Sequence, residues 1–147
     1  MMKKKTTGKS TKYVLLVEDN PDDVALTQAA FEKSHIPNKL VVASNGKEAL
    51  DYLFGQSKYA SRDISDLPGV ILLDVKLPQV SGPEVLKQIR LNTRTCRLPI
   101  VVLSSSVNLQ EIDECERLGI NRYFRKPATF EQFVKIIEEI RSTWLNT

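Results

Sequence analysis

The sequence predicts an α/β fold in which buried parallel strands alternate with helices. Short apolar runs recur along the chain and are bounded by Gly, Pro, Asn or Asp, as is typical of strands buried on both faces. The segments between these runs carry the apolar spacing and the capping residues of helices. Regular alternation of this kind implies right-handed crossovers, with helices on both faces of one sheet.

The first half of the chain supplies three of the expected strands. They are residues 13–17, 39–43 and 70–73. A helix is expected from Asn20 to about Ser34, because a capping Asn, an early Pro and two acids favour a helix start. A second helix is expected over residues 47–54, after a turn at Asn45-Gly46. Residues 55–67 are polar, so we expect a longer loop there that extends the preceding helix by at most a turn.

The second half continues the alternation with strands at residues 98–103 and 121–124. Helix starts are expected at Ser81 and Asn108, each followed three positions later by a Glu. The last helix should span about Thr129 to Trp144, with an apolar stripe facing the core. Ten elements in this order fit a flavodoxin-like, doubly wound, five-stranded parallel sheet of order 2-1-3-4-5.

The composition indicates one domain with a basic tail. Of the 21 basic residues, five precede residue 13, so the remaining body carries 16 bases against 18 acids. We therefore expect residues 1–12 to be a disordered tail and residues 13–147 to be the domain. A body without basic excess argues against nucleic-acid binding. No apolar run approaches the ~20 residues of a membrane helix, and no signal segment is evident, so a cytoplasmic protein without a membrane contact is expected.

The cysteines and the histidine predict neither a disulfide framework nor a zinc site. Cys96 and Cys115 are the only cysteines, and they are expected to be reduced, partly buried thiols. His35 is the only histidine, which excludes a histidine-rich metal site. It is expected to cap or pack at the end of the first helix.

Acidic residues follow two strands that the predicted order places side by side. Glu18 and Asp19 follow the strand at 13–17, and Asp74 follows the strand at 70–73. Ligands of open α/β sheets bind beyond the carboxyl ends of the strands, at such a switch point. Three crowded carboxylates repel one another, and a divalent cation relieves that repulsion. The oxygen ligands suit Mg²⁺, with Mn²⁺ as an alternative.

Two further polar groups are expected at the same edge of the sheet. Ser104 follows the strand at 98–103, and Lys126 follows the strand at 121–124. Each of these residues, taken alone, is as well explained as a turn, capping or solvated residue. Their joint placement favours phosphoryl transfer onto Asp74, with the metal and Lys126 neutralising the phosphoryl oxygens.

The chain resembles the receiver domain of bacterial two-component response regulators. The residues that carry the resemblance are Glu18-Asp19, Asp74, Leu77-Pro78, Gly82, Ser104, Tyr123 and Lys126-Pro127. More narrowly, residues 52–55 (YLFG), the long loop after them and the lack of an output domain resemble the small response regulators paired with cyanobacterial phytochromes. The resemblance covers residues 13 to 147.

The resemblance implies a phosphoacceptor protein with no enzyme activity beyond its own phosphorylation and dephosphorylation. Asp74 would accept the phosphoryl group from a histidine of a sensor kinase, and the narrower resemblance implies a phytochrome as that kinase. Glu18, Asp19, Asp74 and the backbone carbonyl of Lys76 would bind Mg²⁺. The resemblance also assigns the remaining roles. Ser104 and Lys126 would stabilise the phosphoryl group, Ser104 and Tyr123 would form the switch, and the Lys126–Pro127 bond would be cis.

Some features leave alternatives open. Lys76 is a long cation two residues after the acceptor, so we expect altered Mg²⁺ affinity or autodephosphorylation. Extra apolar surface near Ile136 and Phe124 suggests a homodimer through the last helix and the strand at 121–124.

A receiver-like interaction module that is never phosphorylated is the main alternative function. A flavodoxin-type phosphate binder is disfavoured, because the acidic loop after the first strand would repel phosphate.

Overall fold

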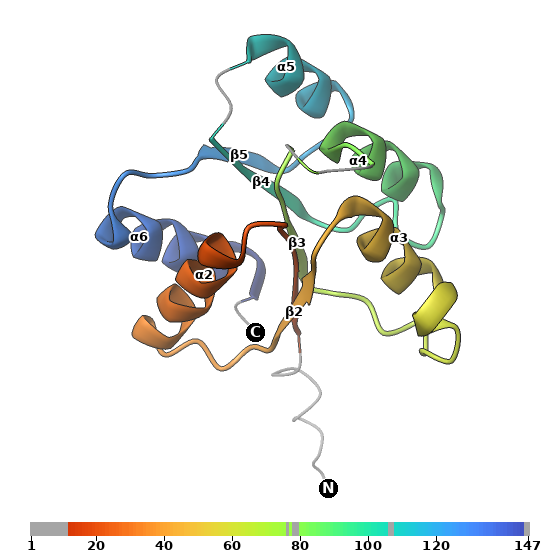
Figure 1. Ribbon diagram of the computed structural model, residues 1–147, viewed down its shortest axis with the longest axis horizontal. Helices are drawn as coiled ribbons and strands as arrows, with labels where there is room; N and C mark the ends of the chain where they lie inside the picture. Colours follow the sequence, from red (N-terminus) through yellow and green to blue (C-terminus); the bar gives the residue numbers. More distant parts are fainter. Residues whose placement is uncertain (1–11, 76, 78–79, 106–107, 146–147) are drawn as a thin grey trace, which may run out of the picture.

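The computed structural model describes residues 12–75, 77, 80–105 and 108–145, and it confirms the expected α/β fold. Within these residues five parallel strands form one sheet of order β2-β1-β3-β4-β5 (Figure 1). The strands are β1 (Val14–Val17), β2 (Leu40–Ala43), β3 (Val70–Leu73), β4 (Ile100–Ser104) and β5 (Arg122–Arg125). Each expected strand is found, with its ends displaced by no more than two residues. Apart from Lys12, the expected basic tail lies outside the described residues.

Helices cover both faces of the sheet, as the alternation predicted. They are α2 (Pro21–Lys33), α3 (Gly46–Phe54), α4 (Gly82–Leu91), α5 (Leu109–Arg117) and α6 (Phe130–Ile140), with the short turns η1 (Ser57–Tyr59) and η2 (Arg141–Leu145). Helices α2 and α6 lie together on one face, and α3 and α4 lie on the other (Figure 1). Each face buries its own cluster, because side chains of successive strand residues point to opposite sides. Tyr123 and Phe124 likewise belong to opposite clusters.

Capping residues start the helices where the sequence predicted. The side chain of Asn20 accepts a hydrogen bond from the backbone N–H of Asp22 at 2.9 Å, and that of Ser81 accepts one from Glu84 at 3.3 Å. Asn45 was expected in a turn, but it caps α3 by accepting from the backbone N–H of Glu48 at 2.8 Å. These bonds satisfy helix N–H groups that have no partner within the helix.

The last helix differs from its prediction in two respects. Helix α6 ends at Ile140, and the chain continues to Leu145 as a wider turn. Of the predicted stripe, Ile137 and Ile140 are buried, whereas Phe130 keeps 38% of its surface exposed. Phe130 is the first residue of α6, whereas the buried residues Ile137 and Ile140 lie in its second half. The predicted stripe therefore contributes to the core mainly through the second half of the helix.

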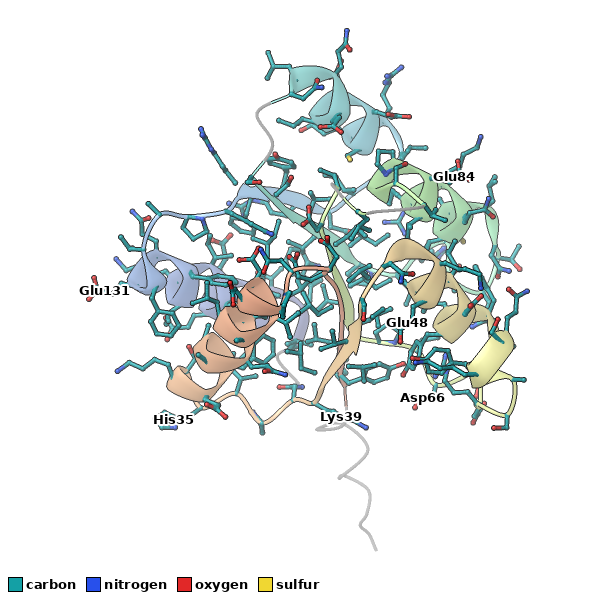
Figure 2. All side chains as sticks on the ribbon, in the orientation of Figure 1. His35, Lys39, Glu48, Asp66, Glu84 and Glu131 are labelled. Atoms are coloured by element: carbon teal, nitrogen blue, oxygen red, sulfur yellow. The ribbon has the colours of Figure 1, made fainter. Side chains whose placement is uncertain are left out.

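The polar segment between α3 and β3 is held by arginine side chains. Gly55 ends α3 with a φ of 66°, a left-handed conformation that a glycine adopts without steric cost. The expected extra turn is a separate one, η1, rather than an extension of α3. Arg94 donates to the backbone carbonyls of Ile64 at 2.6 Å and Leu53 at 2.7 Å. Glu48 on α3 and Asp66 in this segment lie on the same side of the molecule (Figure 2).

Replacing Arg94 by Ala should loosen this segment without unfolding the sheet. Two charge-assisted hydrogen bonds to carbonyls would be lost, for a cost of about 2 kcal/mol in unfolding free energy. Urea denaturation measures that cost, and limited proteolysis should show faster cleavage within residues 55–69. Arg97→Ala is the matched control, because Arg97 is exposed. Equal proteolysis of both variants would contradict the proposed role of Arg94.

The two free cysteines should differ in reactivity. Cys115 is fully buried, and burial raises the pKa of its thiol to about 11, with nearby Glu114 adding to the rise. Cys96 is partly exposed. Because the thiolate is the reactive form, a disulfide reagent at pH 8 should label Cys96 alone in the native protein and both cysteines in urea. Rapid native labelling of Cys115 would contradict the packing of α5.

Candidate functional site

Strand pairing brings the two acidic ends together. Val17, the last residue of β1, pairs with Leu73, the last residue of β3, so Glu18 and Asp74 follow at the same level. The backbone N–H of Glu18 donates to Ala43 at 3.0 Å, and that of Asp74 donates to Val17 at 3.1 Å. These bonds continue the sheet ladder by one residue and fix both backbones. Glu18 and Asp74 are buried, whereas Asp19 is exposed.

The three carboxylates fit a hard divalent cation. One oxygen from each of Glu18, Asp19 and Asp74 lies within 4.8 Å of the others. Mg²⁺ and Mn²⁺ prefer carboxylate oxygens and retain water ligands, which the exposed Asp19 side would admit. Lys76, whose backbone carbonyl was expected to complete the ligand set, lies outside the described residues. His35 lies at the far end of α2, away from these strand ends (Figure 2).

Lys126 places a positive charge among the acids. Its ammonium lies 2.8 Å from a Glu18 oxygen, 2.8 Å from an Asp23 oxygen and 3.3 Å from an Asp74 oxygen. The backbone N–H of Lys126 donates to the carbonyl of Ser104 at 2.9 Å, which anchors the loop after β5 to the end of β4. The predicted convergence of Glu18, Asp74 and Lys126 is therefore observed in the structure.

Asp23 is the member of this cluster that sequence reasoning did not assign to the site. Its position in the first turn of α2 is explained by the favourable interaction of an acid with a helix N-terminus. Nothing in the local sequence distinguishes it from Asp22, its exposed neighbour. Only the packing of α2 beside the loop after β5 reveals that Asp23 faces Lys126.

Burial and charge act on the titrating groups in opposite directions. Burial raises the pKa of Glu18 to about 7, although the hydrogen bond from Lys126 opposes that rise and the charge of Asp74 adds to it. Burial acts to lower the pKa of Lys126, but its hydrogen bonds to Asp23 and Glu18 outweigh burial, so the net pKa is raised. The cluster thus keeps Lys126 charged, and a bound divalent cation would favour the ionised form of Glu18.

Ser104 and Tyr123 lie on the neighbouring strands β4 and β5. Ser104 ends β4 and is fully buried, and Tyr123 lies on β5, paired with Val102. Burial raises the pKa of Tyr123, while a hydrogen bond with the Ser104 side chain opposes that rise. The two residues predicted to act together are therefore in contact.

One expectation about this site is wrong. The Lys126–Pro127 peptide bond was expected to be cis, but no described residue follows a cis bond, so this bond is trans. Trans is the intrinsic preference of an X–Pro bond, by about 0.5–1 kcal/mol. With the trans bond, the Lys126 ammonium still reaches Glu18, Asp23 and Asp74.

The loop after β3 closes tightly on the start of α4. The backbone N–H of Gly82 donates to the carbonyl of Val75 at 3.1 Å. A Cβ at Gly82 would lie 2.4 Å from the Cα of Val75 and 3.0 Å from the carbonyl oxygen of Asp74. Glycine is therefore required at this position for the loop that carries Asp74 to keep its path.

The fold and the acidic cluster define a class of protein: a doubly wound α/β domain with a carboxylate site at its switch point. The family model described as the response regulator receiver domain matches residues 14–138. The chain therefore belongs to the response regulator receiver family. Among the described residues, no helix has the length and apolar character required to cross a bilayer.

Curated relatives match most of this chain. The response regulator Rcp1 of Synechocystis sp. is 35% identical over 136 residues, which cover 92% of this chain and 90% of Rcp1. The probable methanogenesis regulatory protein FilR2 of Methanothrix harundinacea is 36% identical over 132 residues, covering 90% of this chain and 83% of FilR2.

Solved structures agree with the same family. The phosphorylated cyanobacterial phytochrome response regulator RcpA superposes with a TM-score of 0.84 at 38% identity, covering 92% of this chain and 95% of RcpA. The Mn²⁺-bound form of Rcp1 superposes with a TM-score of 0.82 at 34% identity, covering 92% of this chain and 96% of Rcp1. Both the fold and the narrower likeness to phytochrome response regulators thus match the expectation from the sequence.

Proposed function

We propose that this response regulator accepts a phosphoryl group on Asp74 from a phosphohistidine of a sensor kinase. The observation that carries the proposal is the position of Asp74, buried at the end of β3 beside a second acid and within 3.3 Å of a lysine ammonium. A carboxylate at the end of a buried strand, beside a lysine ammonium, can act as a nucleophile toward a phosphoryl group.

Each residue of the pocket has a separate role in the transfer of the phosphoryl group. An Asp74 oxygen attacks phosphorus, a P–O bond forms, and the P–N bond breaks, which leaves the histidine of the donor and an acyl phosphate. Glu18, Asp19, Asp74 and the backbone carbonyl of Lys76 would hold Mg²⁺, which, when bound, neutralises charge on the phosphoryl oxygens. The Lys126 ammonium supplies further positive charge, and its raised pKa keeps it protonated. The relative Rcp1 has been crystallised with Mn²⁺, which supports an oxygen-ligand site of this kind.

Ser104 and Tyr123 form the switch in this proposal. The Ser104 hydroxyl would turn to donate to a phosphoryl oxygen on Asp74, and Tyr123 would follow it inward. Their hydrogen bond supports this coupling, because breaking it releases the Tyr123 ring. The surface around β5 would then differ between the two phosphorylation states, and partners would bind one of them more tightly.

A phytochrome-type histidine kinase is the donor that we propose. The support is the likeness of the chain, over nine tenths of its length, to the phytochrome response regulator RcpA. A direct test is to supply purified phytochrome kinases with ATP and to compare their transfer rates with those of unrelated histidine kinases. Transfer from the unrelated kinases alone would contradict the pairing.

We also propose a homodimer through α6 and β5. The groove between them is lined by Arg125, Pro127, Lys135 and Ile136, so it combines apolar and basic surface. On β5 beside this groove, Phe124 is only partly buried, and the Arg122 guanidinium lies over its ring at 4.3 Å. Sedimentation velocity before and after phosphorylation tests the dimer, and a monomer in both states would contradict it.

The alternative is a receiver-like interaction module that is never phosphorylated. The two functions differ in one measurement. Acetyl phosphate with Mg²⁺ should add one phosphoryl group to the wild-type protein, as intact mass reports, and EDTA should prevent the addition. Asp74→Asn should remain unmodified. A wild-type protein that stays unmodified with both acetyl phosphate and kinase would favour the interaction module.

A further inference from the structure

The Lys126 ammonium lies closer to Asp23 than to Asp74. Its distance is 2.8 Å to the Asp23 oxygen and 3.3 Å to the Asp74 oxygen. Asp23 comes from a helix, α2, whereas Glu18 and Asp74 come from strand ends, so Asp23 approaches the lysine from a separate element. The ammonium is thus shared between Asp23 on α2 and Glu18 after β1, each at 2.8 Å, and its contact with the proposed acceptor Asp74 is the longest of the three.

The backbone at Asp23 is anchored within α2, and its carboxylate lies beside apolar side chains. Its backbone carbonyl accepts a hydrogen bond from the hydroxyl of Thr27 at 2.8 Å, and Thr27 is buried. Asp23 and Lys126 also line a small cavity of about 50 Å³ whose other walls are largely apolar, among them Leu26 and Phe133. An ion pair beside apolar walls is screened less than one at an open surface.

Asp22 offers a natural comparison at the adjacent position. Both acids lie in the first turn of α2, so both interact favourably with the helix N-terminus. Asp22 is exposed and makes no ion pair among those found in the described residues. A change at Asp22 therefore reproduces the loss of one negative charge and of the helix-end interaction, but leaves Lys126 in place.

We propose that Asp23 is a positioning residue that keeps the Lys126 ammonium from closing fully on Asp74 until the phosphoryl group arrives. The effect on phosphoryl transfer rests on the proposed function, whereas the ion pair between Asp23 and Lys126 does not depend on that function. While Lys126 is shared with Asp23 and Glu18, its contact with Asp74 stays at 3.3 Å, so it competes with a divalent cation for the Asp74 carboxylate less than a closer pair would. Once Asp74 carries the phosphoryl group, the greater charge on its oxygens draws Lys126 across. The strength of the ion pair between Asp23 and Lys126 therefore determines how much free energy that movement requires.

Asp23→Asn should change metal affinity and phosphoryl lifetime in a defined way. Without Asp23 the ammonium would move closer to Asp74 and compete more strongly with Mg²⁺, so the Mg²⁺ Kd measured by titration calorimetry should rise about fivefold. The acyl phosphate should last longer, because Lys126 no longer has to leave Asp23 to stay with the phosphoryl group. Asp22→Asn should change both quantities less than twofold, and Asp23→Glu should restore much of the wild-type Mg²⁺ affinity.

A metal-free measurement separates this inference from the proposed function. Double-mutant cycles combine each Asn variant with Lys126→Met and compare stabilities from the urea midpoint in EDTA. The unfolding free energies should show coupling between Lys126 and Asp23, and none between Lys126 and Asp22. Equal Mg²⁺ affinity of the two Asn variants, or absence of coupling between Asp23 and Lys126, would overturn the positioning role. Failure of the wild-type protein to accept a phosphoryl group would contradict the proposed function. The double-mutant cycle and the Mg²⁺ titrations would still decide the role of Asp23.

Discussion

Replacing Lys126 by Met is expected to destabilise the metal-free protein by about 3 kcal/mol, because a largely buried cation is removed from its carboxylate partners. Its side chain is 22% exposed and contacts Glu18, Asp23 and Asp74. Without it, these three carboxylates lose the ammonium that forms ion pairs with all of them. The same change should make the free energy of unfolding depend more strongly on Mg²⁺. Without the Lys126 ammonium, Mg²⁺ relieves a larger repulsion among the carboxylates and does not compete with the ammonium for their oxygens.

Urea denaturation with EDTA and with saturating Mg²⁺ measures both effects. The Mg²⁺-dependent gain in stability should be larger for Lys126→Met than for the wild type. Lys87→Met is the control, because Lys87 is an exposed lysine on α4, and it should behave like the wild type. An equal Mg²⁺ effect in Lys126→Met and wild type would contradict a lysine that shares its carboxylates with the metal.

Replacing Gly82 by Ala is expected to be the second large effect, with a loss of about 3 kcal/mol from overpacking against backbone. The added Cβ would meet the Cα of Val75 at 2.4 Å and its carbonyl oxygen at 2.9 Å. Neither atom belongs to a side chain that can rotate away. Relief requires the loop after β3 to shift, and that shift moves Asp74 relative to Glu18.

The test of Gly82→Ala compares its effects on stability and on the site. Phosphorylation by acetyl phosphate should fall under conditions where the variant is still folded, and its Mg²⁺ affinity should fall with it. Gly69→Ala is the control, because the nearest atoms that its Cβ would meet belong to the side chains of Lys12 and Leu145, at 3.1 to 3.3 Å. Normal Mg²⁺ affinity in folded Gly82→Ala would show that the loop tolerates the shift.

The strand order and most of the site follow from local sequence. Apolar runs such as residues 70–73 have few alternatives to a buried strand, and the chain order of strands and helices leaves few topologies. Once β1 and β3 are neighbours, Glu18 and Asp74 must lie close together. Caps such as Asn20 and Ser81 were predictable because they act on N–H groups only a few residues away.

The features that were missed depend on contacts between distant parts of the chain. Asp23 and Lys126 are separated by 103 residues, and the local sequence around Asp23 is fully explained by a helix start. Arg94 holds the segment before β3 from 30 residues away, at Ile64, so that segment looked like an unsupported loop. Exposure of Phe130 depends on where α6 leaves the sheet, which an apolar stripe does not specify.

Reduction of the phosphorylated protein with borohydride tests the central claim most directly. Hydride cleaves an acyl phosphate and converts the aspartate that carried it into homoserine, which peptide mass mapping then locates. The proposed role of Asp74 predicts homoserine at position 74 and at no other acidic residue, with none formed in EDTA. Homoserine at position 19 or 23, or a phosphoryl group on Ser104 that resists borohydride, would contradict it.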